Sequence, residues 1–271
     1  MNDRAKCGTI GETYGGKTMK ARLAKICSIL PFALILAAFP IFAESGKYKI
    51  DGKSYCKQIF DDKGNQISHF ANWELIENFF VSPDETKMLV YHRPDKAKAF
   101  LITLYDLQGG TLVAEVEPGW HCDDVRWTKD YLIYIWGTSG GGTRFEYRNY
   151  ETLEVVRVLN ARIFFEFPEE NVLIEKPDFG GGKCTFYNYS DGSEIKTVDF
   201  KERLFRKLWA SDEPKIKALA GTGKGIFVGG TYIVDVRKVG NRKYSFDLDY
   251  VFFVEDDEEG EERSLTMEIE I

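Results

Sequence analysis

The chain has little of what marks the more specialised classes of protein. Only 8 of its 271 residues are Pro and charge is spread along its length, which excludes collagen-like and wholly disordered chains. With only 3 His, a metal site built from several histidines is close to excluded. There is no excess of positive charge, because 36 Lys and Arg face 43 Asp and Glu, a formal charge of −7. That balance argues against nonspecific binding to nucleic acid or to anionic lipid.

Long helical patterns are also nearly absent after residue 44. Short β-branched and aromatic runs alternate instead with Gly, Asp and Asn turns, at the spacing of an all-β fold. One short helix is expected over Lys201–Lys207, on the outside of the strands. A hairpin of residues 250–254 and 264–271 is expected to end the chain, joined by an acidic turn.

An export signal is predicted near the N-terminus. Residues 26–43 form an apolar run without charge, and a basic cluster at residues 20–25 precedes it, which is the order found in secretory signal peptides. A membrane helix is the alternative, but a run of roughly 18 residues is marginal for crossing a bilayer and this one holds two prolines. Cleavage is expected after Ala43.

Residues 1–18 are an unusual extension in front of such a signal, and translation is expected to begin at Met19. The predicted organisation is therefore an upstream extension over residues 1–18, a signal peptide over 19–43 and a single domain over 44–271. The mature protein is expected outside the cytoplasm of a bacterium, in the periplasm or beyond, with no membrane anchor after signal cleavage.

Three glycine-rich or acidic segments resemble ligand loops but lack the context that such loops need. Gly11–Thr18 matches the phosphate-binding pattern G-x-x-x-x-G-K-[ST], yet only ten residues precede it and the export signal follows. Gly221–Gly225 precedes a strand-like run rather than a helix, so a turn is expected there. The acidic run Glu255–Glu262 lacks the alternating ligand order of a calcium loop and is expected at a solvated hairpin tip.

Three cysteines, Cys56, Cys122 and Cys184, remain after signal cleavage. An odd number in a compartment that permits disulfides leaves two alternatives open. Either one bridge forms and one thiol stays free, or all three are buried free thiols.

The clearest signal is internal repetition. One copy runs from Trp127–Ile135 through a glycine run at 140–142 to Phe145–Tyr150, and forty residues on a second runs from Phe167–Ile174 through glycines at 180–182 to Phe186–Tyr189. An earlier copy covers residues 81–113, the run 59–67 fits the last strand pair of a still earlier one, and a more degenerate copy is expected from Trp209 to Asp235.

The copy over residues 81–113 carries a family resemblance. Its Ser82-Pro83-Asp84-Glu85 turn, followed by the apolar run Met88–Tyr91 and then by Leu104–Leu107 with a Gly turn, resembles the repeats of TolB-type and WD-repeat-like β-propellers. The resemblance covers roughly residues 59–235. The later copies depart from it, with Thr128–Asp130 and Pro168–Glu170 in place of the motif, and no copy has a His or Trp-Asp signature.

Such repeats imply an all-β, propeller-like array of about four to five four-stranded antiparallel blades. A bent β-sandwich of repeated hairpins is the alternative. A single blade cannot bury both of its faces, so neighbouring blades must stack to form the core. Aromatic side chains on the strands are therefore expected to pack between blades: Tyr134, Trp136, Phe164, Phe165 and Phe167.

In a propeller frame the connections at residues 137–143, 177–183 and 221–225 occupy the same position in each blade and lie on one face. The connection Glu117–Asp124 between two blades emerges on that face as well. The candidate ligand-binding residues are those at its end: Trp120, His121, Asp123 and Asp124. Loops on a rigid scaffold are free to vary and to bind, whereas repeated strands are committed to packing.

No catalytic or metal-binding residue is assigned and no cofactor is expected. Adjacent residues on an extended chain point to opposite sides, so the run His121–Asp124 cannot converge on one ion, and no pattern identifies a base for the Cys122 thiol. The expected function is that of an exported, noncatalytic binding module whose partner is another envelope protein or a small ligand. A carboxylate-dependent hydrolase or lyase using His121, Asp123 and Asp124, or a structural envelope component, are the alternatives.

The mature protein is expected to begin at Glu44, because the apolar run ends in Ile41-Phe42-Ala43. N-terminal sequencing of the protein from its native host checks this. A mature chain that still contains Gly11–Thr18 would contradict both the export signal and the dismissal of the phosphate-loop pattern.

Overall fold

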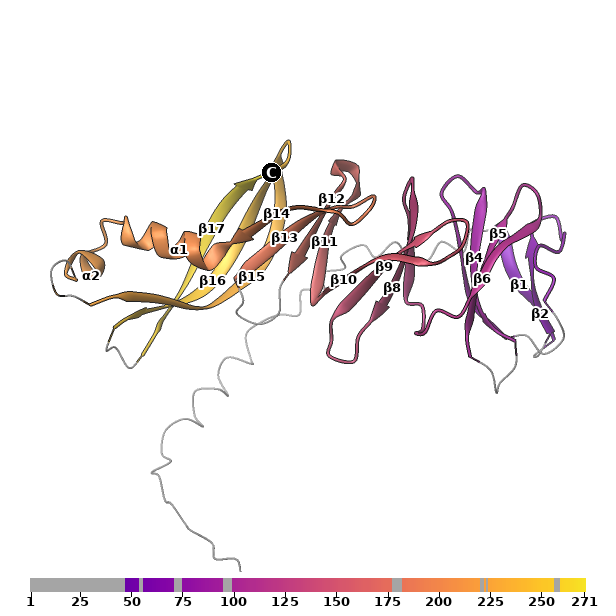
Figure 1. Ribbon diagram of the computed structural model, residues 1–271, viewed down its shortest axis with the longest axis horizontal. Helices are drawn as coiled ribbons and strands as arrows, with labels where there is room; N and C mark the ends of the chain where they lie inside the picture. The colour runs from indigo at the N-terminus through magenta and orange to yellow at the C-terminus, as the bar shows by residue number, and fades with distance from the viewer. Residues whose placement is uncertain are drawn as a thin grey trace, which may run out of the picture. The chain divides into compact units, whose positions relative to one another are not determined.

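The computed structural model describes residues 47–271, except for 54–55, 71–74, 95–98, 177–181, 220–221, 223 and 256–258 (Figure 1). The chain divides into two units, residues 1–44 and 45–271. The expected signal peptide and the Gly11–Thr18 pattern lie outside the described residues. Among the described helices, none is both long and apolar enough to cross a membrane.

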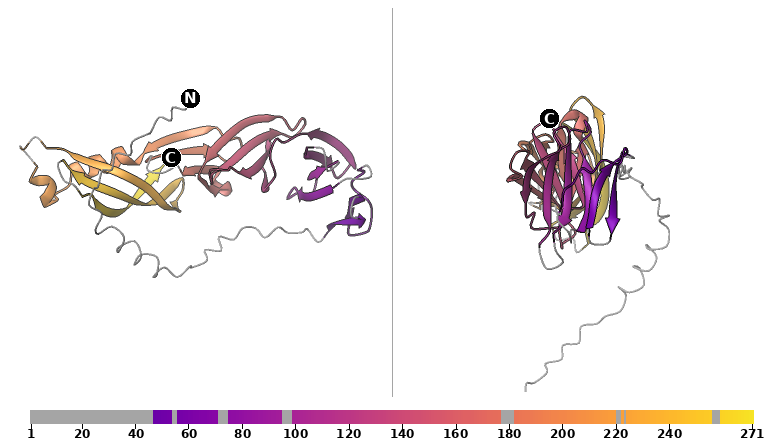
Figure 2. Two further views of the ribbon diagram at one scale, coloured as in Figure 1. Left: turned by 90° about the horizontal axis from the view of Figure 1, so that it is seen from below. Right: turned by 90° about the vertical axis from the view of Figure 1, so that its right-hand side faces the viewer.

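Within each sheet, every strand pairs antiparallel with the strand next to it in the chain (Figures 1 and 2). The first sheet has two strands, β1 (Tyr48–Lys53) and β2 (Cys56–Asp61). Three sheets have four strands each. Their bounds are β3 (Leu75–Val81), β4 (Lys87–Arg93), β5 (Leu101–Asp106) and β6 (Thr111–Val116); β7 (Asp124–Trp127), β8 (Tyr131–Gly137), β9 (Thr143–Asn149) and β10 (Val155–Ala161); and β11 (Ile163–Phe167), β12 (Val172–Lys176), β13 (Lys183–Asn188) and β14 (Glu194–Asp199).

The predicted all-β fold of repeated four-stranded antiparallel sheets is confirmed. The two copies forty residues apart fall on equivalent elements, since β9 and β13 are each the third strand of a four-stranded sheet. In the second copy the motif-replacing segment Pro168–Glu170 forms a short 3-10 helix between β11 and β12. Of the glycine run at 180–182, only Gly182 lies within the described residues.

The middle strands are apolar on both faces, and each face packs against a different sheet. On β8, Leu132, Tyr134 and Trp136 contact residues of sheet β3–β6. The alternate residues Ile133 and Ile135 join a cluster with residues of sheet β11–β14. Because successive side chains of a strand point to opposite faces, an unbroken apolar run can satisfy two neighbouring sheets at once. Burying each such side chain contributes about 2 kcal/mol.

The first sheet differs from expectation. The run 59–67 was expected to supply two paired strands, but β2 pairs with β1, and the chain after β2 returns along it through one bridge, between Phe60 and Gln66. Backbone bonds from Asp61 N to Asn65 O at 2.9 Å and from Ile67 N to Ile59 O at 2.7 Å flank this bridge. The Ser68 side chain adds two more bonds, since its Oγ accepts from Ile59 N at 2.8 Å and donates to Gln58 Oε1 at 2.7 Å.

The four-stranded repeat ends after β14. Helix α1 (Phe200–Trp209) follows at once, with the Asp199 side chain accepting from Glu202 N at its N-terminus. Its residues Phe200, Leu204 and Leu208 are buried at helical spacing, which confirms the helix expected over Lys201–Lys207. Because α1 extends to Trp209, the degenerate copy expected from that residue does not form a blade.

Three long strands complete the fold after the short helix α2 (Pro214–Lys217). They are β15 (Ile226–Gly240), β16 (Lys243–Val254) and β17 (Glu261–Glu270). The pairing of β16 with β17 confirms a hairpin at the end of the sequence, but residues 261–263, which were expected in the acidic turn, belong to β17 and pair with residues 250–252. Gly225 lies just before β15, where its N donates to Glu255 Oε2 at 2.7 Å, and not between the second and third strands of a blade. Gly221 and Gly223 lie outside the described residues.

The turn between β13 and β14 joins neighbouring sheets through Gly192. Gly192 has a φ of +66°, and a Cβ there would lie 2.6 Å from Tyr147 Cε2 and 2.9 Å from Arg157 Cδ. Its carbonyl accepts from Arg157 Nη1 at 3.1 Å, and Tyr147 Oη donates to the nearby Tyr189 O at 3.2 Å. The absence of a side chain at this position therefore permits the contact between sheet β7–β10 and sheet β11–β14.

Gly192→Ala should lower the free energy of unfolding by about 3 to 4 kcal/mol, from the left-handed backbone and the clash together. Gly64→Ala is the matched control, because Gly64 also has a positive φ, of +84°, but nothing lies within 4 Å of its added Cβ. The control should cost only about 1 to 2 kcal/mol. Urea unfolding monitored by tryptophan fluorescence measures both, and equal losses would contradict the contact.

Candidate functional site

The connection from β6 to β7, residues 117–123, is held in place by buried polar groups of sheet β7–β10. Tyr134 Oη donates to Trp120 O at 2.7 Å and Arg148 Nη2 donates to Pro118 O at 3.4 Å. Gly137 N donates to Asp123 Oδ2 at 2.5 Å, which brings this connection beside the glycine-rich loop at 137–143. Both Tyr134 and Arg148 come from strands of the same sheet, so the loop is fixed to a rigid scaffold.

Trp120 is half-exposed and forms a platform on this loop. Its side chain is 58% exposed, and its ring stacks on Trp136 with 4.9 Å between centroids and 19° between planes. Trp136 is only 5% exposed, and the Arg144 guanidinium lies 5.3 Å from the centroid of its ring. Trp120 therefore has one face covered by Trp136 while much of its surface faces solvent, an arrangement suited to stacking with a ligand.

His121 and Asp123 lie together beside this platform, and Asp124 turns away from them. His121 Nε2 lies 3.1 Å from Asp123 Oδ1, with both side chains about half exposed. Asp124 Oδ1 accepts from Val125 N at 2.7 Å, and its other oxygen pairs with Arg126. The separation follows from the alternation of side chains as the chain enters β7.

Cys122 is placed as a packing residue. Its side chain contacts the apolar cluster between sheets β3–β6 and β7–β10, and its Sγ lies 3.6 Å from Asp124 O. Burial raises the pKa of the Cys122 thiol above its ordinary value, which keeps it protonated at neutral pH. All three described cysteines are free thiols, as in one of the two alternatives that the sequence left open, but only Cys184 is buried, whereas Cys56 and Cys122 are partly buried.

A buried charged cluster beneath the loop was missed by sequence reasoning. Glu146 and Arg148 are 3% and 4% exposed, and Arg148 Nη2 donates to Glu146 Oε2 at 2.5 Å. Arg144 Nε donates to Glu146 Oε1 at 2.9 Å, and Trp136 Nε1 lies 3.4 Å from the same oxygen. The sequence does contain a pattern that indicates this cluster: Arg144, Glu146 and Arg148 alternate along one strand, so they share a face, and their charges are complementary.

This charged cluster connects strand β9 to the loop that carries Trp120. Arg148 also donates through Nη1 to Leu153 O at 2.9 Å, so its guanidinium connects Glu146, the β9–β10 turn and the loop carbonyl of Pro118. Removing one partner of such a buried pair leaves the other charge uncompensated, which is strongly destabilising. The cluster is therefore best understood as positioning the platform.

A second polar arrangement lies in a cavity of about 660 Å³ on sheet β3–β6, which sequence reasoning also missed. Thr103 Oγ1 donates to Glu115 Oε2 at 2.8 Å and lies 2.6 Å from Nε2 of His92, a residue 1% exposed. Because the single hydroxyl proton goes to Glu115, His92 Nε2 must carry the proton shared with Thr103. The Phe70 ring covers the imidazole at a centroid distance of 4.3 Å.

Within the part of the chain that the structure describes, no group of three or more His, Cys, Asp or Glu side chains is arranged to hold a metal ion. The glycine-rich loop at 137–143 lies beside the Trp120 loop, as the hydrogen bond from Gly137 to Asp123 shows. Residues 177–181 of the corresponding loop in the next sheet lie outside the described residues.

Comparison with known proteins gives no family. A scan against protein-family models finds no match, and a search of curated proteins finds none either. Among solved structures, an uncharacterised protein from Listeria monocytogenes EGD-e matches with a TM-score of 0.39 and 15% identity, over 76% of this chain and 58% of that chain. The WD40 domain of Toxoplasma gondii coronin matches with a TM-score of 0.35 and 13% identity, over 56% and 42% of the two chains.

A structure described as the eukaryotic initiation factor matches with a TM-score of 0.35 and 8% identity, over 82% of this chain and 65% of that chain. The chain thus spans less than two thirds of the length of each of these three proteins. At TM-scores this low, none of the likenesses supports an inference about function.

Trp120→Ala should lower the free energy of unfolding by less than about 2 kcal/mol, because the lost ring is largely solvated and its main partner is one stacked indole. Trp136→Ala is the matched comparison and should cost about 3 to 5 kcal/mol, since that ring is buried. Denaturant unfolding of both variants checks this. A larger loss for Trp120→Ala than for Trp136→Ala would show that Trp120 is a core residue.

Proposed function

We propose that this protein is an exported, noncatalytic binding module that holds a protein or a small ligand on the loop around Trp120. The observation that carries the proposal is the half-exposed Trp120 ring, stacked on the buried Trp136 and fixed through its own backbone by the Tyr134 hydroxyl. An aromatic ring held rigidly before binding loses little conformational entropy when a ligand stacks on it. The export signal predicted from the basic and apolar residues 20–43 is the basis for the proposed location outside the cytoplasm.

The surrounding side chains favour binding over catalysis. His121 and Asp123 are half-exposed to water, where their interaction is screened, and the carboxylate of Asp124 is engaged with Arg126. The nearby thiol of Cys122 is partly buried and its pKa is raised by desolvation, so it is a poor nucleophile. What the loop offers is an aromatic surface with hydrogen-bonding groups at its rim, which is the usual composition of a recognition site.

A thermal-shift screen of the mature protein against peptides and small molecules tests the proposal. A ligand present at about one hundred times its Kd should stabilise the folded state by about 2.7 kcal/mol, or roughly 5 to 10 °C in Tm for a domain of this size. The shift should disappear in Trp120→Ala, because the stacking surface is gone.

Val156→Ala is the matched control, since Val156 is 54% exposed on β10, away from the platform. This variant should respond to the ligand as the unmodified protein does. A ligand that stabilises Trp120→Ala as strongly as the unmodified protein would place the binding site elsewhere, and a screen without any stabilising compound would count against a small-molecule ligand.

A further inference from the structure

One face of the last sheet, β15–β17, is open to solvent. The residues Phe246, Leu248, Tyr250 and Phe252 of β16 are buried in the cluster shared with sheet β11–β14 and α1. Alternate residues point the other way, and strand register places three rows of them across this outer face: Phe227 and Phe253; Gly229, Val251 and Glu262; Tyr232, Asp249 and Ser264. Phe227 is 56% exposed and Tyr232 is 45% exposed.

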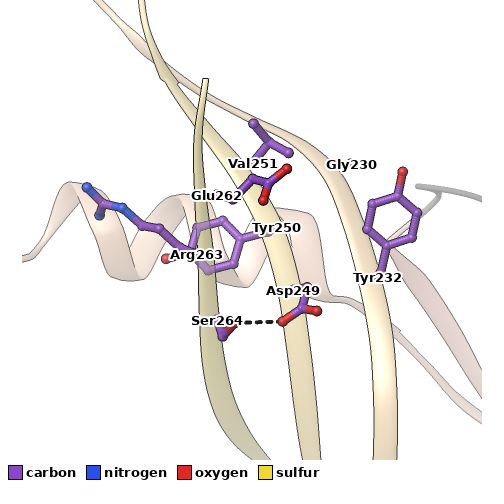
Figure 3. Close-up of a pocket in the computed structure, with 8 residues that line it drawn as sticks. All are labelled: Gly230, Tyr232, Asp249, Tyr250, Val251, Glu262, Arg263 and Ser264. Carbon is purple, nitrogen blue, oxygen red and sulfur yellow. Dashed lines mark hydrogen bonds between the residues drawn. The ribbon is translucent and has the colours of Figure 1, made fainter. Parts of the chain in front are cut away.

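A hollow of about 460 Å³ lies at these rows (Figure 3). Its lining includes Tyr232, Asp249, Val251, Glu262 and Ser264 of this face, together with Tyr250 and Arg263, which alternate with them along their strands. It forms where β15 carries two glycines in succession and the register with β16 shifts between Gly229 and Tyr232. The space directly over the two glycines is filled, since a Cβ on Gly229 would lie 3.2 Å from Phe253 Cε2 and one on Gly230 would lie 3.4 Å from Val251 Cγ2. The hollow therefore lies beside this irregular stretch of β15.

The Tyr232 ring lies over Gly230, and the Phe253 ring lies over Gly229. A Cβ on Gly230 would lie 3.2 Å from Tyr232 Cε2 and 3.6 Å from its Oη, and the left-handed φ of +48° suits glycine there. Glycine in a strand with an aromatic side chain laid over it is a known way to stabilise the backbone at such a site. The ring is thus supported by the backbone on one side and is partly open to solvent on the other.

Asp249 and Ser264, which lie in the same row of the sheet as Tyr232, form a hydrogen-bonded pair. Ser264 Oγ donates to Asp249 Oδ1 at 2.7 Å, as the dashed line in Figure 3 shows. The serine therefore orients the carboxylate, which retains acceptor capacity at Oδ2, and the serine oxygen can still accept a hydrogen bond. The positive charge of Arg263 is already committed, since its two Nη atoms donate to Glu213 at 2.5 and 2.7 Å.

We propose that this hollow binds an uncharged saccharide. A sugar ring has an apolar C–H face that can stack on Tyr232, and hydroxyl groups that can donate to Asp249 and exchange hydrogen bonds with Ser264. Anionic ligands are disfavoured by Asp249 and Glu262. Two copies of the chain meeting through this face would bring carboxylates against carboxylates, which disfavours self-association here. The site is separate from the Trp120 loop and does not depend on the function proposed for it.

Isothermal titration calorimetry of the mature protein tests the proposal, with soluble hexasaccharides of β-1,4-linked glucose, α-1,4-linked glucose and β-1,4-linked N-acetylglucosamine as probes. At least one should bind. Tyr232→Ser should weaken that binding about tenfold or more through loss of the stacking surface, whereas Tyr232→Phe, which keeps the ring, should stay within about threefold of the unmodified protein.

Phe205→Ser is the control for loss of an exposed aromatic, because Phe205 is 41% exposed on α1 rather than on this face, and it should bind normally. Trp120→Ala should also bind normally, which separates this site from the proposed loop site. Failure of all three saccharides to bind, or unchanged binding by Tyr232→Ser, would overturn the proposal.

The charge of the ligand is tested in the same assay. Saccharide binding should change little between about 50 mM and about 500 mM NaCl, because the ligand has no charge to screen. A hexalysine peptide is the probe for an organic cation. If hexalysine binds in a way that is lost in Asp249→Asn and at high salt, while the saccharides do not bind, the hollow is a cation site and the proposal is wrong.

Discussion

The fold depends on one constraint, that the central strands of the four-stranded sheets are apolar on both faces. A sheet of this kind exposes as much apolar surface as it buries until another sheet covers its second face. Sheet β7–β10 meets the constraint by packing β8 against residues of sheet β3–β6 on one side and of sheet β11–β14 on the other. Stability is therefore shared between neighbours, and contacts at the turns, such as that of Gly192 with Tyr147, keep those neighbours in register.

Polar groups inside this apolar array fix what the loops present. Glu146 is neutralised by Arg148 and Arg144, and the spare donors of Arg148 reach carbonyls that belong to turns. The Tyr134 hydroxyl serves the same purpose at Trp120 O. Because a buried donor without a partner costs free energy, these bonds fix the loop to the strands beneath it. The exposed Trp120 ring therefore rests on a buried polar framework.

Much of the fold could be predicted from the sequence, since strands and turns follow local rules. Alternation of side chains, glycine turns and the forty-residue offset identified β9 and β13 as equivalent strands, and the run Lys201–Lys207 predicted the helix that the structure shows as α1. The point at which the repeat stops was not predictable in this way. The segment from Trp209 to Asp235 was predicted to be another blade because it contains short strand and turn patterns. Those patterns do not show that Trp209 ends a helix and that the strands after it are long and form a three-stranded sheet.

The sequence by itself determined the period of the strands, the repeat and the presence of a loop at residues 117–124 that carries Trp120, because these depend on neighbours along the chain. Only the tertiary structure decided that Tyr134 and Arg148 bind the carbonyls of Trp120 and Pro118, and that a hollow lies beside Asp249 where the register of β15 with β16 shifts. Those outcomes depend on which strand is paired with which and in what register. The register sets the face on which each side chain lies, and local sequence does not specify it alone.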